Sequence, residues 1–594
     1  MKLSKKGRVG LAGCLGLGLG IALVFNWMAR SEAEHQRFYE TGKMINSFLS
    51  EYGQALKISQ SEGDLAALSR MYAADYATPG RGQWMLEAGQ NIRDVATFEL
   101  VEKGTQHYGK TDLLGEIAQY LVGLAAIDRV KIKIDLIDLE RTDPDRQTVL
   151  TVKHILDGVD QQGGVLQDRF FFRWTLVNQD APDGYDWKIQ RDELVEGVRV
   201  VSQRRSFVEV EAASIGIDYK HQRDPQLDPD RADLRFQMIQ HAFGGVSAVD
   251  YDGDSRPDLF FADGQRCRLY RNEGGRRFTD VTEAAGLDGI GRASVGLFGD
   301  MDNDGHEDLV VVRYMAPILF FHNQGDGTFV DRSAAMGLDF VVPAVSACLL
   351  DFDRDGFLDL YLAAYGNAFE AIPRLFFFAQ NGEANRLLHN EGGHRFVDVT
   401  QESGTGDTGW SLAVAAGDYD GDGYPDLISA NDFGRKNLYR NQGDGTFAEV
   451  AKEAGVLDFS GGMGVAFGDF NDDGRSDIYT SNINSNQRWF GEQVTITNYL
   501  RNVIRTKWAL LDLGEYIEMY DLIGSDWVEL GKIVGEGNSL FQNEGDGTFR
   551  ELMDSRTNRA GWGWSVAFFD ADNDADLDLY AANGWISNDP ASDL

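Results

Sequence analysis

The sequence of 594 residues predicts a mainly β protein made of repeated sheet units, preceded by an apolar helix and a smaller α+β domain. Three observations predict this organisation. A nine-residue aspartate pattern recurs six times from Asp250 onward, each time between apolar, strand-like runs. Residues 31–200 lack that pattern and combine helix-like with strand-like spacing of apolar residues. An uncharged run at residues 9–28 has the length of a membrane-spanning helix.

Length and charge restrict the class of protein. A chain of 594 residues exceeds what one hydrophobic core holds, so two or more domains are expected. The formal net charge is −38, from 94 acidic and 56 basic residues. A nucleic-acid binder must neutralise phosphates, so we expect no nucleic-acid partner. The carboxylates are either a solubilising surface or cation ligands, and their clustering in one recurring pattern favours cations.

The N-terminus reads as a basic cytoplasmic tail, residues 1–8, followed by a signal-anchor helix over residues 9–28. At about 1.5 Å per residue, this run reaches across a hydrocarbon core of about 30 Å. Lysines and an arginine precede it, and Glu32 and Glu34 follow it. This charge order favours a single pass through a cytoplasmic (inner) membrane, with the N-terminus inside and the bulk periplasmic or extracellular. A cleaved signal peptide and lipoprotein processing at Cys14 are the alternatives, so cleavage is left open.

Residues 31–200 predict an α+β domain. Apolar spacing predicts helices over 33–56 and 65–76 and a further helical stretch over 92–125, interrupted near 104–109. Four strands are expected at 130–139, 148–156, 168–177 and 186–198. The segment from Ile45 to Tyr72 resembles the opening of the NTF2-like (SnoaL-like) cone fold. Some proteins of this fold are isomerases or dehydratases that use a His–Asp pair, but no local motif ties His107 or His154 to a carboxylate. We therefore expect a spacer or binding module in which both histidines are ordinary surface or core residues.

From residue 206 onward, oxygen-bearing side chains recur at positions 1, 3, 5 and 9 of a nine-residue loop. The six copies are Asp250, Asp252, Asp254 and Asp258; Asp300, Asp302, Asp304 and Asp308; Asp351, Asp353, Asp355 and Asp359; Asp418, Asp420, Asp422 and Asp426; Asp469, Asn471, Asp473 and Asp477; and Asp570, Asp572, Asp574 and Asp578. Aspartate also forms turns, but six copies in one register exclude coincidence. Four carboxylates packed together repel one another without a cation.

Calcium explains this spacing. The ion takes six to eight oxygen ligands at about 2.3–2.6 Å. Alternate residues of a tight loop point the same way, so positions 1, 3 and 5 converge, position 7 offers a backbone carbonyl and position 9 completes the shell. Up to six Ca²⁺ are expected, which would bring the net charge from −38 to −26.

The residues after position 5 distinguish this loop from other calcium loops. Position 6 must turn sharply, which favours glycine. Four copies comply, whereas Ser255 and Ala575 predict weaker first and last sites. Position 10 is apolar in every copy, from Leu259 to Leu579, where an EF-hand would continue to a glutamate at position 12. The predicted site is therefore strand–loop–strand.

A second element, Asn-x-Gly-x-x-x-Phe, follows five of the loops and predicts a β-hairpin turn. Loop starts are spaced by 50, 51, 67, 51 and 101 residues. About 50 residues suits a four-stranded propeller blade. The longest gap holds an insertion at residues 488–535, read as an excursion within the fifth unit, or else as a diverged seventh blade. We expect the strand at Phe207 to pair with the last unit and close the ring.

These motifs resemble the FG-GAP/VCBS repeat family and, with Gly286-Leu287 and Gly299-Asp300-Met301-Asp302, its cartilage-acidic-protein-like members. The resemblance covers residues 206–594 and implies a β-propeller, calcium and extracytoplasmic interaction. The expected function is a membrane-anchored, calcium-binding recognition or scaffold module for a protein or glycan partner. The alternative is a carbohydrate-active lyase or dehydratase built on the propeller. The sequence shows no cluster of His, Lys, Tyr or Arg with acids outside the loops, so no catalytic residue is assigned.

Overall fold

The computed structural model describes residues 45–78, 85–92, 95–101, 108–138, 141–142, 146–179, 186–202, 210–227, 244–374, 378–483, 537–552, 557, 563–571 and 575–583. Contacts divide the chain into two compact units, Met1–Val208 (the N-terminal unit) and Glu209–Leu594 (the repeat unit). Within the described ranges no helix is both long and apolar enough to cross a membrane. Residues 9–28 lie outside those ranges, so the anchor stays a prediction.

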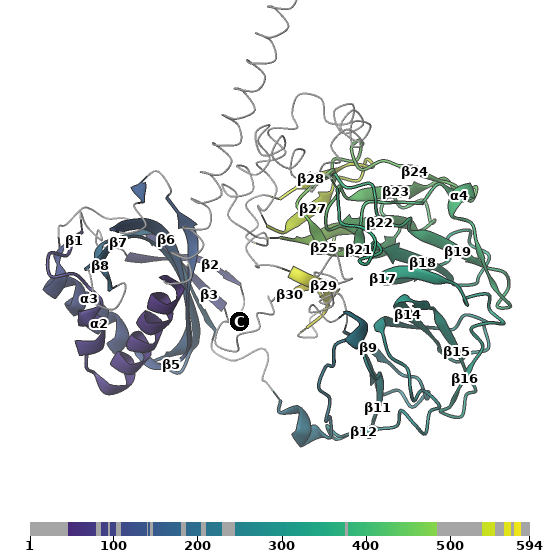
Figure 1. The fold of residues 1–594 in the computed structure, drawn as a ribbon, viewed down its shortest axis with the longest axis horizontal. Coiled ribbons are helices and arrows are strands. Elements are labelled where there is room, and N and C mark those ends of the chain that lie inside the picture. Colours follow the sequence, from purple (N-terminus) through teal and green to yellow (C-terminus); the bar gives the residue numbers. More distant parts are fainter. Residues whose placement is uncertain are drawn as a thin grey trace, which may run out of the picture. The chain divides into compact units, whose positions relative to one another are not determined.

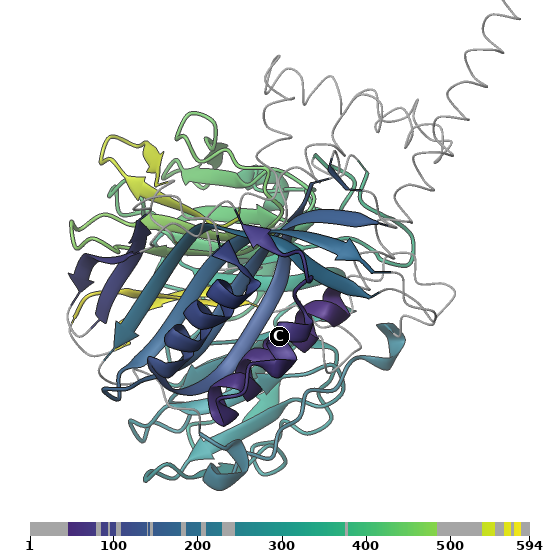
Figure 2. The same ribbon diagram turned by 90° about the vertical axis from the view of Figure 1, so that its left-hand side faces the viewer.

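The N-terminal unit is a curved six-stranded antiparallel sheet, ordered β2-β3-β8-β7-β6-β5. Its strands are β2 (Met85–Ile92), β3 (Val95–Val101), β5 (Leu124–Ile137), β6 (Gln147–Asp160), β7 (Val165–Asn178) and β8 (Trp187–Ser202). A short pair, β1 (Ala77–Thr78) and β4 (Tyr108–Gly109), stands apart from it. A helix over residues 45–62, α2 (Ala66–Arg70) and α3 (Lys110–Val122) complete the unit, and the two longer helices lie on one face of the sheet (Figure 2).

Helix and sheet share one apolar cluster because their inward residues follow the expected periods. Ile45, Leu49 and Tyr52 from the first helix and Leu113 and Ile117 from α3 are buried. They pack on alternate residues of the long strands. The four predicted strands are confirmed and extend further than expected.

The prediction of helix over residues 92–125 is wrong in its first part. Residues 95–101 form β3, which pairs with both β2 and β8, so strand pairing overrides the ambiguous local spacing. Among the described residues of that stretch only α3 is helical, and the predicted second helix is reduced to α2.

The repeat unit consists of successive antiparallel sheets. The strands, in chain order, are β9 (Gly245–Val249), β10 (Asp258–Ala262), β11 (Arg268–Asn272) and β12 (Phe278–Asp280); β13 (Ala293–Gly299), β14 (Asp308–Pro317), β15 (Leu319–Asn323) and β16 (Phe329–Asp331); β17 (Val341–Leu350), β18 (Asp359–Ala364), β19 (Arg386–Asn390) and β20 (Phe396–Asp398); β21 (Ser411–Gly417), β22 (Asp426–Asn431), β23 (Asn437–Asn441) and β24 (Phe447–Glu449); β25 (Gly462–Gly468), β26 (Asp477–Asn482), β27 (Ser539–Asn543) and β28 (Phe549–Glu551); and β29 (Gly563–Phe569) and β30 (Asp578–Asn583). A one-turn helix, α4 (Thr400–Ser403), follows β20.

Each sheet is a meander whose strands pair in chain order. The first strands of neighbouring sheets pack on one another from β9 through β29, with the outer strands facing away (Figure 1). The second and third sheets are also joined, because the end of β14 pairs with the start of β17 through Ala316↔Val342. Several four-stranded antiparallel sheets in this order are consistent with propeller blades.

The hairpin after the long gap belongs to the fifth sheet, as predicted, since Ile478 of β26 pairs with Phe541 of β27. Residues 488–535 lie outside the described ranges, as does Phe207. The choice between six and seven blades and the closure by Phe207 therefore stay predictions.

Candidate metal centres

The aspartate loops join the first strand of each sheet to the second. The first loop, for example, leaves β9 at Val249 and enters β10 at Asp258. Position 9 is the first residue of the second strand in all six sheets, and position 10 continues that strand. The strand–loop–strand prediction is thereby confirmed.

The backbone of the loops turns through the left-handed region twice. Position 6 has φ between 64° and 93° in all six loops, as the glycine preference predicts. Ser255 and Ala575 adopt this conformation with a side chain, which costs roughly 1–2 kcal/mol each. Position 4 also has φ between 57° and 74° in the first five loops. The sequence reading missed this second turn, although Gly253, Asn303 and Asp472 are residue types that favour it.

The position-1 carboxylate shapes the turn. In the second loop, Asp300 accepts the backbone N–H groups of Asp304 at 3.0 Å and Gly305 at 2.8 Å. The position-5 side chain makes a smaller turn, since Asp304 accepts the N–H of His306 at 2.9 Å. The same bonds recur in the first, third and fifth loops. Turn formation alone therefore accounts for positions 1 and 5.

In the third, fourth and fifth loops the position-3 side chain also accepts the N–H of position 5. Turn formation does not account for position 3 in the first two loops. Asp252 Oδ1 and Asp302 Oδ1 are buried, and no hydrogen-bond donor in the described chain reaches them. A buried acceptor without a partner is destabilising, and a bound cation would satisfy it. The residues present thus fit a cation at the first two loops.

Position 9 is a buried carboxylate in the first five loops, whereas Asp578 in the sixth loop is exposed. Asp308, at 0% exposure, accepts the N–H of Met301 at position 2 and the N–H of Asn323 in the next hairpin. Burial raises the pKa of Asp258 and Asp308 to about 6, and the carboxylates at position 3 add to the rise while the backbone N–H groups oppose it. The same causes raise the pKa of Asp359 and Asp426 to about 7. A nearby cation would offset this cost of burying negative charge.

The structure brings the predicted ligands together in four of the loops. Ligand atoms lie within 4.8 Å of one another in the groups Asp250, Asp252 and Asp254; Asp302, Asp304 and His322; Asp353, Asp355 and His389; Asp351, Asp353 and Asp359; and Asp418, Asp420 and Asp426. In the fifth loop Arg475 donates to Asp473 at position 5, and in the first loop Arg256 pairs with Asp254. Asp572 and Asp574 of the sixth loop lie outside the described residues.

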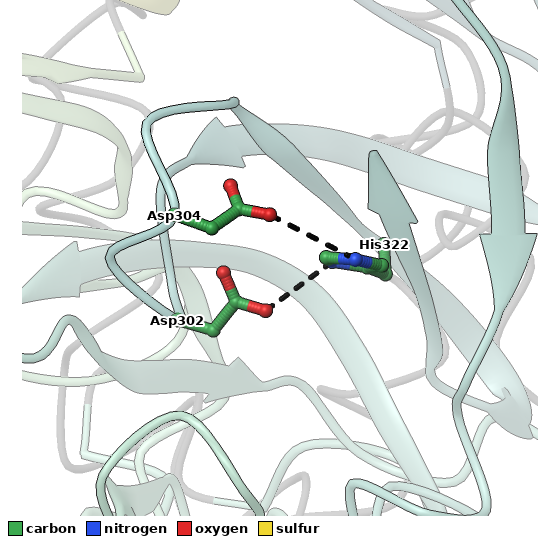
Figure 3. A group of neighbouring side chains, drawn as sticks. All are labelled: Asp302, Asp304 and His322. Atoms are coloured by element: carbon green, nitrogen blue, oxygen red, sulfur yellow. Dashed lines mark ion pairs between the residues drawn. The ribbon is translucent and has the colours of Figure 1, made fainter. Parts of the chain in front are cut away.

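Two histidines enter these clusters, and sequence reasoning did not assign them. Both Asp302 and Asp304 point at the imidazole of His322, on β15 (Figure 3). His322 Nδ1 lies 3.3 Å from Asp302 Oδ2, and Nε2 lies 3.9 Å from Asp304 Oδ2. The signal was available only through strand pairing, because Leu309 pairs with Phe321 and thereby sets His322 beside Asp308.

The asparagine of the hairpin motif connects neighbouring loops, a role that the turn prediction did not include. Asn441 Nδ2 donates to the position-2 carbonyl of the preceding loop, Phe352 O, at 2.8 Å, and to Pro425 O in its own loop at 3.1 Å. Its Oδ1 accepts the N–H of Gly443 at 2.9 Å, which is the predicted turn. The same pattern recurs at Asn323, Asn390 and Asn543. The first five loops are thus anchored one to the next.

The N-terminal unit places its one described histidine in the interior. His154 is surrounded by Tyr52, Phe172 and Trp174, with ring centroids 4.6–5.7 Å from its own. His107 lies outside the described residues.

Comparison with known proteins identifies the repeat. The FG-GAP-like repeat model matches residues 250–311, 300–362, 375–429, 418–480 and 526–581. Human cartilage acidic protein 1 is 26% identical over 381 residues, 58% of this chain and 57% of that protein. The mouse protein is 28% identical over 265 residues, 41% of this chain and 40% of that protein. The chain therefore spans only about two-fifths to three-fifths of the length of these relatives.

Solved structures show remote likeness. An Agrocybe aegerita lectin that recognises non-reducing terminal N-acetylglucosamine is 16% identical, with a TM-score of 0.30, over 73% of this chain and 85% of that chain. The V. cholerae biofilm matrix protein Bap1 is 15% identical, with a TM-score of 0.23, over 40% of this chain and 34% of that chain. At these TM-scores neither likeness says anything about ligands. From these matches and its aspartate loops, the chain contains FG-GAP-like repeats within residues 250–362, 375–480 and 526–581 and is distantly similar to cartilage acidic protein 1.

Proposed function

We propose that the chain is a calcium-stiffened β-propeller that serves as a recognition scaffold on the outer side of a cytoplasmic membrane. The observation that carries the proposal is the pair of buried, unpartnered position-3 oxygens in the described part of the loops, Asp252 Oδ1 and Asp302 Oδ1. They lie among carboxylates whose pKa values burial raises, so the loops are destabilised until positive charge arrives. Hard oxygen ligands on a flexible loop are the ligands that Ca²⁺ prefers.

The location is part of the proposal. Extracellular calcium modules bind at roughly 10⁻⁴–10⁻³ M, so constitutively filled loops suit a compartment rich in calcium. The basic tail and apolar run at residues 1–28 would hold the chain to the membrane, with the repeat unit outside. The role is binding rather than catalysis, and the partner is a protein or a glycan. The insertion at residues 488–535 is the proposed contact segment.

Calcium binding is tested by equilibrium dialysis of the full chain against calcium. We expect up to six ions per chain, and Asp418→Ala, at position 1 of the fourth loop, should remove one. Asp444→Ala is the matched control, because Asp444 belongs to the hairpin turn of the same sheet and accepts only from Thr446. A chain that binds no calcium, or a control that loses as much as Asp418→Ala, would contradict the proposal.

The partner is tested separately by capture from membranes and by a glycan array, each with the full chain and with residues 488–535 deleted. Binding that disappears with the deletion supports this segment as the contact surface. Binding that survives places the contact elsewhere on the repeat unit.

A further inference from the structure

Position 9 begins the second strand of each sheet, and the residue opposite it on the third strand differs among the loops. Strand pairing sets His322 opposite Asp308 and His389 opposite Asp359. The same position holds Arg271 in the first sheet, Arg440 in the fourth and Gln542 in the fifth. Of the five loops whose facing strand is described, only the second and third, the histidine loops, therefore receive a side chain that can coordinate a metal through nitrogen.

The imidazole of His322 is held by the buried carboxylate. Its Nδ1 lies 3.0 Å from Asp308 Oδ1, and Asp308 is otherwise engaged by two backbone N–H groups. An ionised carboxylate only accepts, so Nδ1 is the donor, and in the neutral imidazole Nε2 then carries the lone pair. Metal-ligating histidines are commonly oriented by such a carboxylate.

The free nitrogen, Nε2, faces Asp304, while Asp302 Oδ2 lies 3.3 Å from Nδ1. His322 is 8% exposed, and its Nε2 makes no hydrogen bond to any residue that the structure describes. Asp304 Oδ2 lies 3.9 Å from Nε2, too far for a hydrogen bond. Two ligands of one ion, each at about 2.0–2.2 Å, lie within about 4 Å of each other. The gap therefore fits an ion between them.

The third loop repeats the arrangement. His389 Nδ1 lies 3.1 Å from Asp359 Oδ1, and its ring packs edge-on to Phe352 at 5.7 Å between centroids. Asp353 and Asp355 supply the carboxylates of its cluster. Two independent copies of one carboxylate–imidazole–carboxylate arrangement argue against a chance contact.

We propose that the two histidine loops bind a divalent transition-metal ion, of the Mn²⁺ to Zn²⁺ series, through one imidazole nitrogen and the position-3 and position-5 carboxylates. Imidazole favours these ions over Ca²⁺, whose ligands are oxygens. The inference rests on the proposed function for its carboxylate ligands and adds a second class of ion to two of the six loops. The arginine and glutamine loops keep all-oxygen ligand sets and stay with calcium.

The test uses Co²⁺ as the probe, because nitrogen ligation changes its visible absorption. The full chain, saturated with about 10⁻³ M calcium, is titrated with Co²⁺ and then with Zn²⁺ as the competitor. We expect two Co²⁺ per chain, displaced by Zn²⁺. The double variant His322→Gln/His389→Gln, which copies the glutamine found at residue 542, should weaken Co²⁺ binding at least about tenfold, the size seen when even an outer-shell partner is lost.

Two variants of the fourth loop serve as controls. Arg440→Gln changes the equivalent position without removing an imidazole, so its Co²⁺ titration should match the wild type. Arg440→His should add a third Co²⁺ site beside Asp418, Asp420 and Asp426. Co²⁺ bound equally well by the histidine double variant, or no Co²⁺ retained by the wild type in calcium, would overturn the inference.

Calcium measured on the same samples separates the two proposals. If the wild type binds calcium but no Co²⁺, only the transition-metal site is rejected. Absence of calcium from every loop rejects the proposed function.

Discussion

The N-terminal unit buries one apolar cluster of 24 residues, whereas the described repeat unit divides its interior among five smaller clusters lying between neighbouring sheets. The first unit excludes water with aromatic and aliphatic side chains around Trp174. The second also buries a carboxylate at the start of each second strand from Asp258 to Asp477. Apolar burial stabilises without a cofactor, while buried carboxylates of raised pKa oppose folding until a cation binds. The two units should therefore differ in their dependence on metal.

Chelation tests that difference most directly. A ligand at ten times its dissociation constant stabilises by about 1.4 kcal/mol per site, so six filled sites contribute about 8 kcal/mol. In calorimetry of the full chain, EDTA should lower the melting temperature of the repeat unit and leave that of the N-terminal unit unchanged. This is the largest shift in melting temperature expected for any of the changes below. A single transition that shifts as a whole would contradict independent units.

A core truncation in each unit sharpens the comparison. Trp174 and Trp410 are both fully buried, one in each unit. Replacing either by alanine should cost about 3–5 kcal/mol through lost burial and a cavity. Trp174→Ala should lower the melting temperature of the transition that EDTA leaves unchanged. Trp410→Ala should lower the melting temperature of the transition that EDTA shifts. Both variants lowering the same transition would break the comparison.

The asparagine anchors are expected to have a smaller effect. Asn441→Ala leaves Phe352 O, Pro425 O and the Gly443 N–H without the side chain, at about 1–3 kcal/mol. The calcium titration should also become less cooperative, because neighbouring loops lose a shared contact. Asn272→Ala is the matched control: in the described chain Asn272 donates only within its own loop, to Pro257 O at 2.9 Å. Equal losses in the two variants would show that the link between loops contributes nothing.

The last prediction concerns pH dependence. Burial raises the pKa of Asp258 to about 6 and that of Asp426 to about 7, against about 3.9 in an unfolded chain. Between these values the folded, metal-free unit binds more protons than the unfolded chain, so its stability falls as pH rises. With EDTA present, the repeat unit should melt at a higher temperature at pH 5 than at pH 7.5. With calcium the order should reverse, because protons compete with the ion.

The sequence predicted what depends on local spacing. The loop register, the strands that start at position 9 and the hairpin regained after the long gap all follow from residues close to one another in the repeat. Pairing between distant strands could not be predicted in the same way. The strand at residues 95–101 is decided by its pairing with β8, and the entry of His322 into the metal cluster by the pairing of β14 with β15. The left-handed turn at position 4 had a local signal in Gly253 and Asn303, but Arg354 at the same position obscured it.

The fifth sheet shows how such a repeat accommodates extra chain. Asn482, the last residue of β26, donates its backbone N–H to Asn538 Oδ1 at 2.8 Å and its side chain to Gly537 O at 2.9 Å. The two ends of a segment of more than fifty residues are thus fastened together before β27 begins. Because lengthening a loop whose ends are already joined adds little closure entropy, this junction tolerates exchange of the segment. Segments of different length and sequence could therefore be inserted between β26 and β27, changing the binding surface while the pairing of the fifth sheet is kept.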